Sequence, residues 1–270
     1  MSSPETVNIG LSPGGLVFAR TRGRWRPGLA DCESVACVES ADAREEEPWR
    51  AALAALASRL PGKATGKTKV KVVLSGRLVR WQLLPWRPEL GGARELAAYA
   101  GLRFRETYGR GAEAWHVQCS PQPPGHPIPA CAIDAGLIEA LRRTCQAADA
   151  RLVAATPYLA TAFDHWRKRF RGGPAWLGLI EPDCLSLGLV SDGRWIGLRS
   201  QRLAESWSAT LPAMMTQLGI AADFAGPPAP VFLAGAIAPP EPIQGLPFSW
   251  LSPEWASARG SVACRMALGV

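Results

Sequence analysis

The sequence predicts a two-lobed α/β fold, and three observations support this prediction. Two units that each open on a β-hairpin lie far apart in the chain, over 7–78 and 175–235. A smaller α/β segment separates them. The chain has 270 residues, which is long for one compact domain and enough for two modest lobes with a sizeable core. Repeated units of this kind are typical of a duplicated α/β architecture.

The first unit opens with two short strands joined by the glycine-containing turn 11–15. Pro48 suits the first turn of a helix, because its missing N–H is one of the donors left unpaired there, and Pro61 ends that helix. The expected elements are strands over 7–10, 16–19, 70–74 and 78–84, a strand that begins near 24–26, and a helix over 48–60.

Helical and strand patterns alternate through the middle of the chain. Asp134 is a suitable N-cap, because its carboxylate can accept hydrogen bonds from the first free N–H groups of a helix. A Pro-rich loop over 121–129 separates two strands. The expected elements are helices over 93–108, 134–145 and 158–170, and strands over 115–119, 130–133 and 151–155.

The last third contains short strands with tight turns, of which Asp192-Gly193 is a hairpin signal. The expected elements are strands over 176–180, 185–190, 195–198 and 231–234, and helices over 203–218 and 262–268. We therefore expect a first lobe over 1–78, an inserted α/β subdomain over 79–156, and a second lobe over 157–270.

The net charge is +7 and the isoelectric point is near 9.3, but the cations are spread along the chain. One cluster of four lies within 167–171. A solvated surface explains these charges best, an anionic lipid surface less well, and nucleic acid least. We expect no nucleic-acid partner.

The sequence has no secretory signal and no apolar run long enough to span a membrane, so a cytoplasmic protein is expected. It contains seven cysteines, an odd number, without a CxxC motif. Buried, reduced thiols are the expected state. The three histidines have no metal-ligand spacing, so no metal site is expected.

Three kinds of enzyme motif are incomplete or missing in this sequence. The segment 62–68 resembles a P-loop, but only three residues separate its glycines, and it follows a helix and precedes a strand, the reverse of the required order. We interpret it as a Lys-rich loop. The sequence has no GxSxG elbow and no recognisable acid/base pair of carboxylates.

Aromatic residues near the expected strand 78–84 are a stronger lead. Trp81 and Trp86 flank Leu83-Leu84. A strand with tryptophans at alternating depth is often ordinary core. If one face is exposed, however, it forms a hydrophobic edge that can take a peptide in a groove or as an added strand.

The order of these elements resembles the PilM family of type IV pilus biogenesis, and it is similar to the cytoplasmic domain of GspL from type II secretion. The segments that carry the resemblance are VVLSGRLVRWQLLPW, ACAIDAGLIEALRRTCQAADARLVAATPYLATAF, AWLGLIEPDCLSLGLVSDGRWIGLRS and the closing SVACRMALGV. The last segment resembles the terminal helix of PilM and suggests a complete chain. The resemblance implies an actin-like, ribonuclease-H-like duplicated fold whose C-terminal helix returns to the first lobe.

Actin-like ATPases hold ATP between two hairpins, and the resemblance places degenerate versions of the binding motifs here. The first hairpin has Asn8 where an acid is normal, and Pro13 removes one amide donor from its turn. The second hairpin, 177–184, has no Asp-x-Gly, and the adenosine segment 231–236 has one glycine. The degenerate candidate positions are Asn8, Gly10, Ser12, Gly14 and Gly235. We therefore expect no nucleotide turnover and no cofactor.

The resemblance implies a scaffold of an inner-membrane assembly platform, of the type IV pilus or type II secretion kind. Such a protein binds the N-terminal cytoplasmic tail of a single-span subunit, PilN-like or GspM-like, and couples it to a motor ATPase. The implied groove lies where the first lobe meets the insertion, with Arg80, Trp81, Leu83 and Trp86 as candidate contacts. The alternative is an active actin-like ATPase or a nucleotide-binding PilM-type protein that holds ATP with magnesium.

Overall fold

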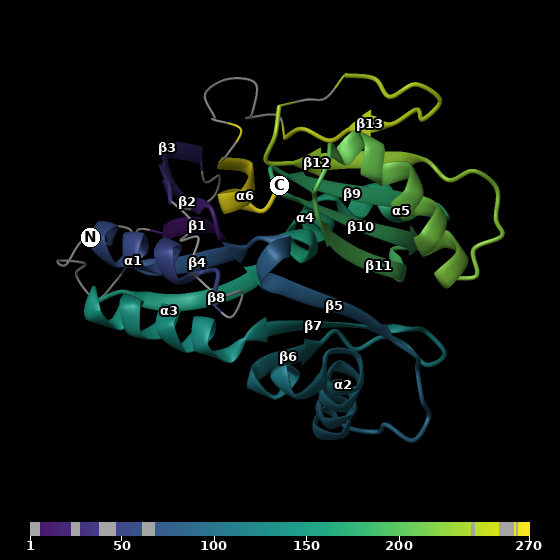
Figure 1. The fold of residues 1–270 in the computed structure, drawn as a ribbon, viewed down its shortest axis with the longest axis horizontal. Coiled ribbons are helices and arrows are strands. Elements are labelled where there is room, and N and C mark those ends of the chain that lie inside the picture. Colours follow the sequence, from purple (N-terminus) through teal and green to yellow (C-terminus); the bar gives the residue numbers. More distant parts are fainter. Residues whose placement is uncertain are drawn as a thin grey trace.

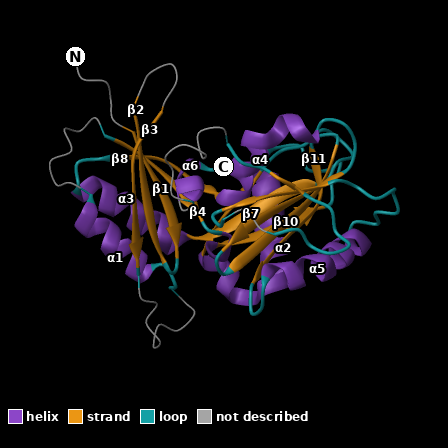
Figure 2. Ribbon diagram, turned by 90° about the horizontal axis from the view of Figure 1, so that it is seen from above, coloured by secondary structure: helices purple, strands orange, loops and turns teal. Residues whose placement is uncertain are grey.

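The computed structural model describes residues 6–22, 28–37, 47–60, 68–238, 241–253, 262 and 264–270. They form two lobes, each built on a five-stranded sheet, and a separate three-stranded sheet (Figure 1). Figure 2 shows the two larger sheets next to each other with helices on their faces. The predicted two-lobed α/β fold with an inserted subdomain is confirmed.

The first lobe contains a sheet in the order β3-β2-β1-β4-β8. Its strands are β1 (Thr6–Ser12), β2 (Gly15–Arg22), β3 (Gly28–Ala36), β4 (Lys69–Leu74) and β8 (Arg151–Pro157). The helices α1 (Arg50–Arg59) and α3 (Ala135–Ala147) share a core cluster with Ile9 and Leu11 of β1. Because neighbouring strand residues face opposite sides, Asn8 and Gly10 belong to the other face of this sheet.

The short helix α6 (Cys264–Leu268) lies on that other face and contacts β1 and β2. Gly10 permits this approach, because a Cβ there would lie 3.1 Å from the backbone nitrogen of Ala267 and from Met266. The hydroxyl of the buried Tyr158 donates a hydrogen bond to the carbonyl oxygen of Val270 at 2.6 Å. The C-terminal segment is therefore packed between the first sheet and α4 (Tyr158–Trp166).

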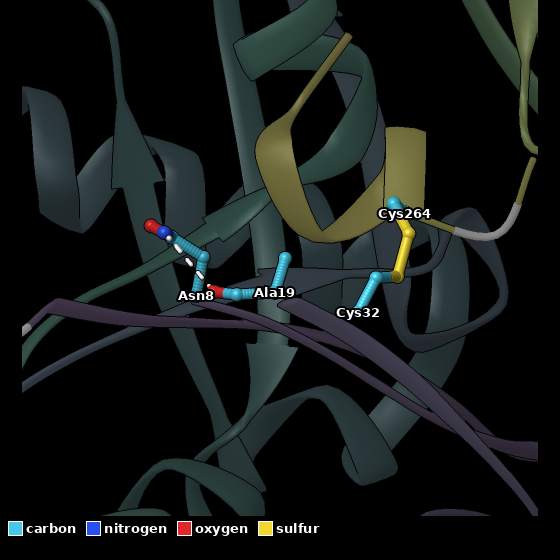
Figure 3. The surroundings of a disulfide bond; sticks show 4 residues. All are labelled: Asn8, Ala19, Cys32 and Cys264. Atoms are coloured by element: carbon cyan, nitrogen blue, oxygen red, sulfur yellow. Dashed lines mark hydrogen bonds between the residues drawn. A yellow bond between two sulfur atoms is a disulfide. The ribbon is translucent and has the colours of Figure 1, made fainter. Parts of the chain in front are cut away.

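A disulfide joins Cys32 of β3 to Cys264 of α6 (Figure 3). The expectation that the cysteines are all reduced is wrong for this pair. The two residues are 232 positions apart in the sequence, and only the return of α6 to the first sheet brings them together. The five other cysteines have free thiols, and burial raises the pKa of the Cys145 thiol to about 11.

The second lobe contains a sheet in the order β11-β10-β9-β12-β13. Its strands are β9 (Ala175–Glu181), β10 (Cys184–Ser191), β11 (Arg194–Arg202), β12 (Val231–Gly235) and β13 (Ser249–Trp250). The helix α5 (Trp207–Ala221) packs on one face, and α4 with the 3-10 turn η3 (Arg167–Phe170) packs on the other. Ser206 caps α5 by accepting a hydrogen bond from Ala209, so α5 begins later than the expected 203.

The inserted subdomain contains a three-stranded sheet in the order β5-β7-β6, covered by α2 (Ala93–Tyr108). Its strands are β5 (Val79–Leu84), β6 (Trp115–Cys119) and β7 (Ile128–Asp134). The 3-10 turns η1 (Gly76–Leu78) and η2 (Gly109–Ala114) precede β5 and β6. Figure 1 shows this subdomain beneath both lobes.

The boundary of the insertion differs from the expected 79–156. Asp134 caps α3 as predicted, accepting hydrogen bonds from Gly136 and Leu137, but α3 packs into the core of the first lobe. The strand β8 then pairs with β4 in parallel. The insertion therefore ends near residue 134. Sequence patterns missed this because parallel pairing between distant strands leaves no local signal.

Two further expectations lie outside the described residues. The strand expected near 24–26 falls within 23–27, and β3 is described from Gly28. Most of the loop 62–68 falls within 61–67. Among the described residues, no helix is long and apolar enough to cross a membrane.

Candidate functional site

The two lobes meet where a turn of the first lobe enters the β9–β10 hairpin of the second. The backbone N–H of Gly76 donates a hydrogen bond to Oε1 of Glu181 at 2.8 Å. Next to it, Nη1 of Arg77 pairs with Oδ2 of Asp183 at 2.5 Å. Both contacts join the lobes. We call this region, Ser75–Arg77 with 181–184, the interlobe junction.

Glu181 is an unusual residue at this junction because it is only 2% exposed. Burial raises the pKa of its carboxyl from 4.5 to about 7, although hydrogen bonds from Ser75 and Gly76 favour the ionised form. The negative charge of Asp183 raises this pKa further, and Arg77 opposes it. Near neutral pH the carboxyl is thus divided between its protonated and ionised forms.

Four of the candidate nucleotide positions lie in the β1–β2 hairpin. Asn8 donates hydrogen bonds from Nδ2 to the carbonyl of Ala19 (Figure 3) and to Oγ1 of Thr21, each at 3.4 Å. Ser12 donates from Oγ to the carbonyl of Gly15 at 3.2 Å, which closes the turn, and Gly14 lies exposed in that turn. Gly10 lies under α6. The polar side chains of this group are thus bonded within their own hairpin.

The fifth position, Gly235, ends β12 in the second lobe. Its φ is 147°, and a Cβ there would lie 2.0 Å from the carbonyl oxygen of Ile180, so only glycine fits. Ile180 directly precedes Glu181, and Ser75 donates a backbone hydrogen bond to Leu11 at 2.9 Å. The ends of β1, β4, β9 and β12 therefore converge on the interlobe junction.

A groove of about 970 Å³ lies between the insertion and the second lobe. Three elements form its walls: the β6–β7 loop, α4 with η3, and the β10–β11 turn. Nη1 of Arg194 lies 3.1 Å from Nε2 of His126, which connects the turn to the loop. We call this cavity the insertion groove.

Aromatic rings line the insertion groove. The rings of Phe163 and Trp195 have centroids 4.3 Å apart, and Trp81 of β5 contributes from the insertion. Trp195 lies against β10 because residue 188 is glycine, where a Cβ would approach its ring to 1.9 Å. Nε1 of Trp81 is buried with no hydrogen-bond acceptor among the described residues. The groove thus offers apolar surface next to polar groups.

Three guanidinium groups, those of Arg167, Arg171 and Arg194, also line this groove. Asp164 and Asp192 line it as well. Among the described residues, neither aspartate forms an ion pair with these arginines. The cationic groups are therefore available to an anionic ligand.

The four candidate partner contacts do not share one surface. Trp81 lines the insertion groove. Arg80 is exposed and donates to the carbonyl of Arg77 at 3.1 Å, whereas Leu83 packs against the core beside α4. Trp86 lies beyond β5 and is 37% exposed. Strand alternation places Arg80 on the face of β5 opposite to Trp81 and Leu83, which both pack against one core cluster, and Trp86 lies outside the strand.

Sequence patterns did not single out Glu181 or the arginines of the groove. Glu181 ends an apolar strand before a Pro-Asp turn, which is also the pattern of an exposed hairpin end. The cluster 167–171 matches a solvated helix end. Among the described residues, no group of three or more His, Cys, Asp or Glu is placed to hold a metal ion.

No protein-family model matches this sequence, and no curated protein matches it either. Solved structures do resemble it. The cytoplasmic domain of EpsL, an inner-membrane component of the Vibrio cholerae type II secretion system, matches with a TM-score of 0.63 and 12% identity, covering 98% of this chain and 95% of that one.

Two further structures are similar at 13–14% identity. The PilM-PilN type IV pilus biogenesis complex matches with a TM-score of 0.59 over 98% of this chain and 86% of that chain. A Bacteroides thetaiotaomicron protein described as having an actin-like ATPase fold matches with a TM-score of 0.59 over 88% and 84%. At these identities the likeness concerns the fold, and the prediction of an actin-like fold is confirmed.

Proposed function

We propose that this protein is a scaffold of an inner-membrane assembly platform of the type II secretion or type IV pilus kind, acting on the cytoplasmic side. The observation that carries the proposal is the match over nearly the full length of the EpsL cytoplasmic domain. The PilM-PilN complex adds support, since a protein of the same fold there has a partner subunit. The proposed partner is the N-terminal tail of a PilN-like or GspM-like single-span subunit, and a motor ATPase is the proposed next component.

The insertion groove is the proposed seat of that tail. It combines aromatic rings with charged groups and lies between the insertion and the second lobe, where Arg194 contacts His126 of the β6–β7 loop. A volume of about 970 Å³ accommodates several residues of an extended peptide. Its walls contain polar and apolar groups in similar measure, which suits a peptide that carries both kinds of side chain.

Co-expression tests this function. The chain is expressed with a tagged single-span membrane subunit encoded beside it, and the complex is purified through the tag. We expect the wild-type chain and the Ile220→Ala control to co-purify, because Ile220 is an exposed residue of α5 outside the groove walls. Trp81→Ala is expected to weaken retention, because Trp81 lines the groove. Failure of the wild-type chain to co-purify with such a subunit contradicts the proposed function.

We also propose that the scaffold works without nucleotide turnover. The β9–β10 turn, which binds phosphate in actin-like ATPases according to the resemblance, contacts Gly76 and Arg77 of the first lobe instead. A buried carboxylate at this position, Glu181, repels phosphate when it is ionised. Isothermal calorimetry with Mg-ATP distinguishes the alternatives: no heat at millimolar ligand supports the scaffold, and saturation at micromolar ligand supports the actin-like ATPase.

A further inference from the structure

We infer that the insertion groove recognises an acidic, extended peptide segment: carboxylates bind Arg167, Arg171 and Arg194, and an apolar side chain packs on the rings of Trp81, Phe163 and Trp195. This inference rests on the proposed function, because it names the chemistry of the tail that the scaffold holds.

The charges of the groove carry the first step. Arg167 and Arg171 project from η3 and the residues after it, and Arg194 begins β11, so two elements of the second lobe direct cations to one cavity. Nη1 of Arg194 contacts Nε2 of His126, and the guanidinium has further N–H groups for a ligand. A guanidinium fork binds a carboxylate through two parallel hydrogen bonds, so a Glu or Asp side chain fits this site.

The aromatic floor carries the second step. Phe163 and Trp195 are 8% and 9% exposed, so their rings present limited faces at the base of the cavity rather than a flat patch. An apolar side chain that enters there contacts these rings, while flanking residues of an extended chain reach the exposed Arg167 and Arg171. A peptide that alternates acidic and apolar residues therefore meets both features.

The distribution of cations argues against a lipid surface. Arg167 and Arg171 line the groove, whereas their exposed neighbours Lys168 and Arg169 are outside its walls. A membrane headgroup layer attracts all four through general electrostatics. A peptide in the groove depends on the two lining arginines. Substitutions of Lys168 and Arg169 are therefore a matched control for substitutions of Arg167 and Arg171.

The test selects peptides on the full chain from a random heptapeptide phage library. The recovered peptides are synthesised with a fluorescent label, and their Kd is measured by anisotropy. We expect enrichment of Asp and Glu next to apolar residues. We also expect about tenfold weaker binding to the Arg167→Glu, Arg171→Glu double variant, and less than a twofold change for the Lys168→Glu, Arg169→Glu double variant.

Several results overturn the inference. These are recovery of no peptide, peptides without acidic enrichment, and equal weakening by the two double variants. A lipid surface is indicated instead if the protein selects no acidic peptide but co-floats with phosphatidylglycerol vesicles, and if both double variants weaken this flotation. If circular dichroism shows that the Arg167→Glu, Arg171→Glu variant does not fold, the Arg167→Gln, Arg171→Gln variant replaces it. This variant is also expected to bind the peptides more weakly than the Lys168→Glu, Arg169→Glu variant does.

Failure of this inference is distinguishable from failure of the proposed function. If the membrane subunit co-purifies equally with the wild type and the Arg167→Glu, Arg171→Glu variant, the scaffold function stands and the acidic-peptide inference is wrong. If acidic peptides bind through these arginines but the single-span subunit does not co-purify, the groove chemistry stands and the proposed function is wrong.

Discussion

Replacing Glu181 with glutamine should change how the stability of the protein depends on pH. The Glu181 carboxyl is buried and accepts a hydrogen bond from the backbone of Gly76. A glutamine side chain is almost the same size, and its amide oxygen can accept the same hydrogen bond. The substitution therefore removes the ionisation and keeps most of the packing at the interlobe junction.

The pKa of Glu181 gives the expected magnitude. It rises from 4.5 to about 7 in the folded protein, so between these pH values the folded state holds a proton that the unfolded state has lost. The free energy of unfolding should fall by about 1.4 kcal/mol per pH unit over this interval. The protonated Glu181 carboxyl therefore contributes stability that is fully present below pH 4.5. This contribution is lost as the pH rises through 7, and the total loss is about 3 kcal/mol.

Urea unfolding at pH 5, 6, 7 and 8, followed by tryptophan fluorescence, measures this effect. The free energy of unfolding of Glu181→Gln should increase relative to that of the wild type as the pH rises. Titration of the other groups is common to both proteins and cancels. Glu139→Gln, at an exposed position of α3, controls for the loss of one acidic group. Parallel stability curves for wild type and Glu181→Gln would refute the reasoning.

Two further predictions concern packing and covalent structure. Gly76→Ala should lower the free energy of unfolding by about 1–3 kcal/mol, because the added Cβ would lie 2.6 Å from Oγ of Ser186 and 3.0 Å from Sγ of Cys184. The control Gly101→Ala in α2 adds a Cβ that meets no atom within 4 Å, and it should raise the free energy of unfolding by about 0.5–1 kcal/mol. Urea midpoints measure both, and equal effects would contradict the first. Cys32→Ser should lower the free energy of unfolding by about 2–5 kcal/mol in non-reducing buffer, and reductant should bring the wild type to the same value, with Cys37→Ser as control. A wild-type melting temperature that reductant leaves unchanged would exclude this stabilising role.

Much of the fold was predictable because it depends on local patterns. The hairpin strands are short, largely apolar runs bounded by turn residues, Asp134 is a recognisable cap, and Asp192-Gly193 forms the β10–β11 turn as predicted. The strand β3 was harder to predict, because the segment GLADCESVA has no regular apolar alternation. Its pairing with β2 is what makes it a strand.

The candidate site was less predictable because its residues come from distant segments. Gly76 and Glu181 are 105 positions apart, and nothing local to either indicates that one donates a hydrogen bond to the other. The burial that shifts the pKa of Glu181 also arises only when the lobes pack together. Arg167 and Arg194 likewise match ordinary surface positions until folding places them around one cavity.

The bond between Cys32 and Cys264 also determines how the molecule responds to mechanical tension. The insertion and the whole second lobe lie inside the covalent loop that this bond closes. When the protein is stretched from its two ends, the sulfur atoms bear the load, and the 232-residue loop cannot lengthen the tether even if it unravels. Reduction of that bond would add roughly 800 Å to the length to which the unfolded chain can be extended. The redox state of this cysteine pair therefore determines how far the protein can be stretched.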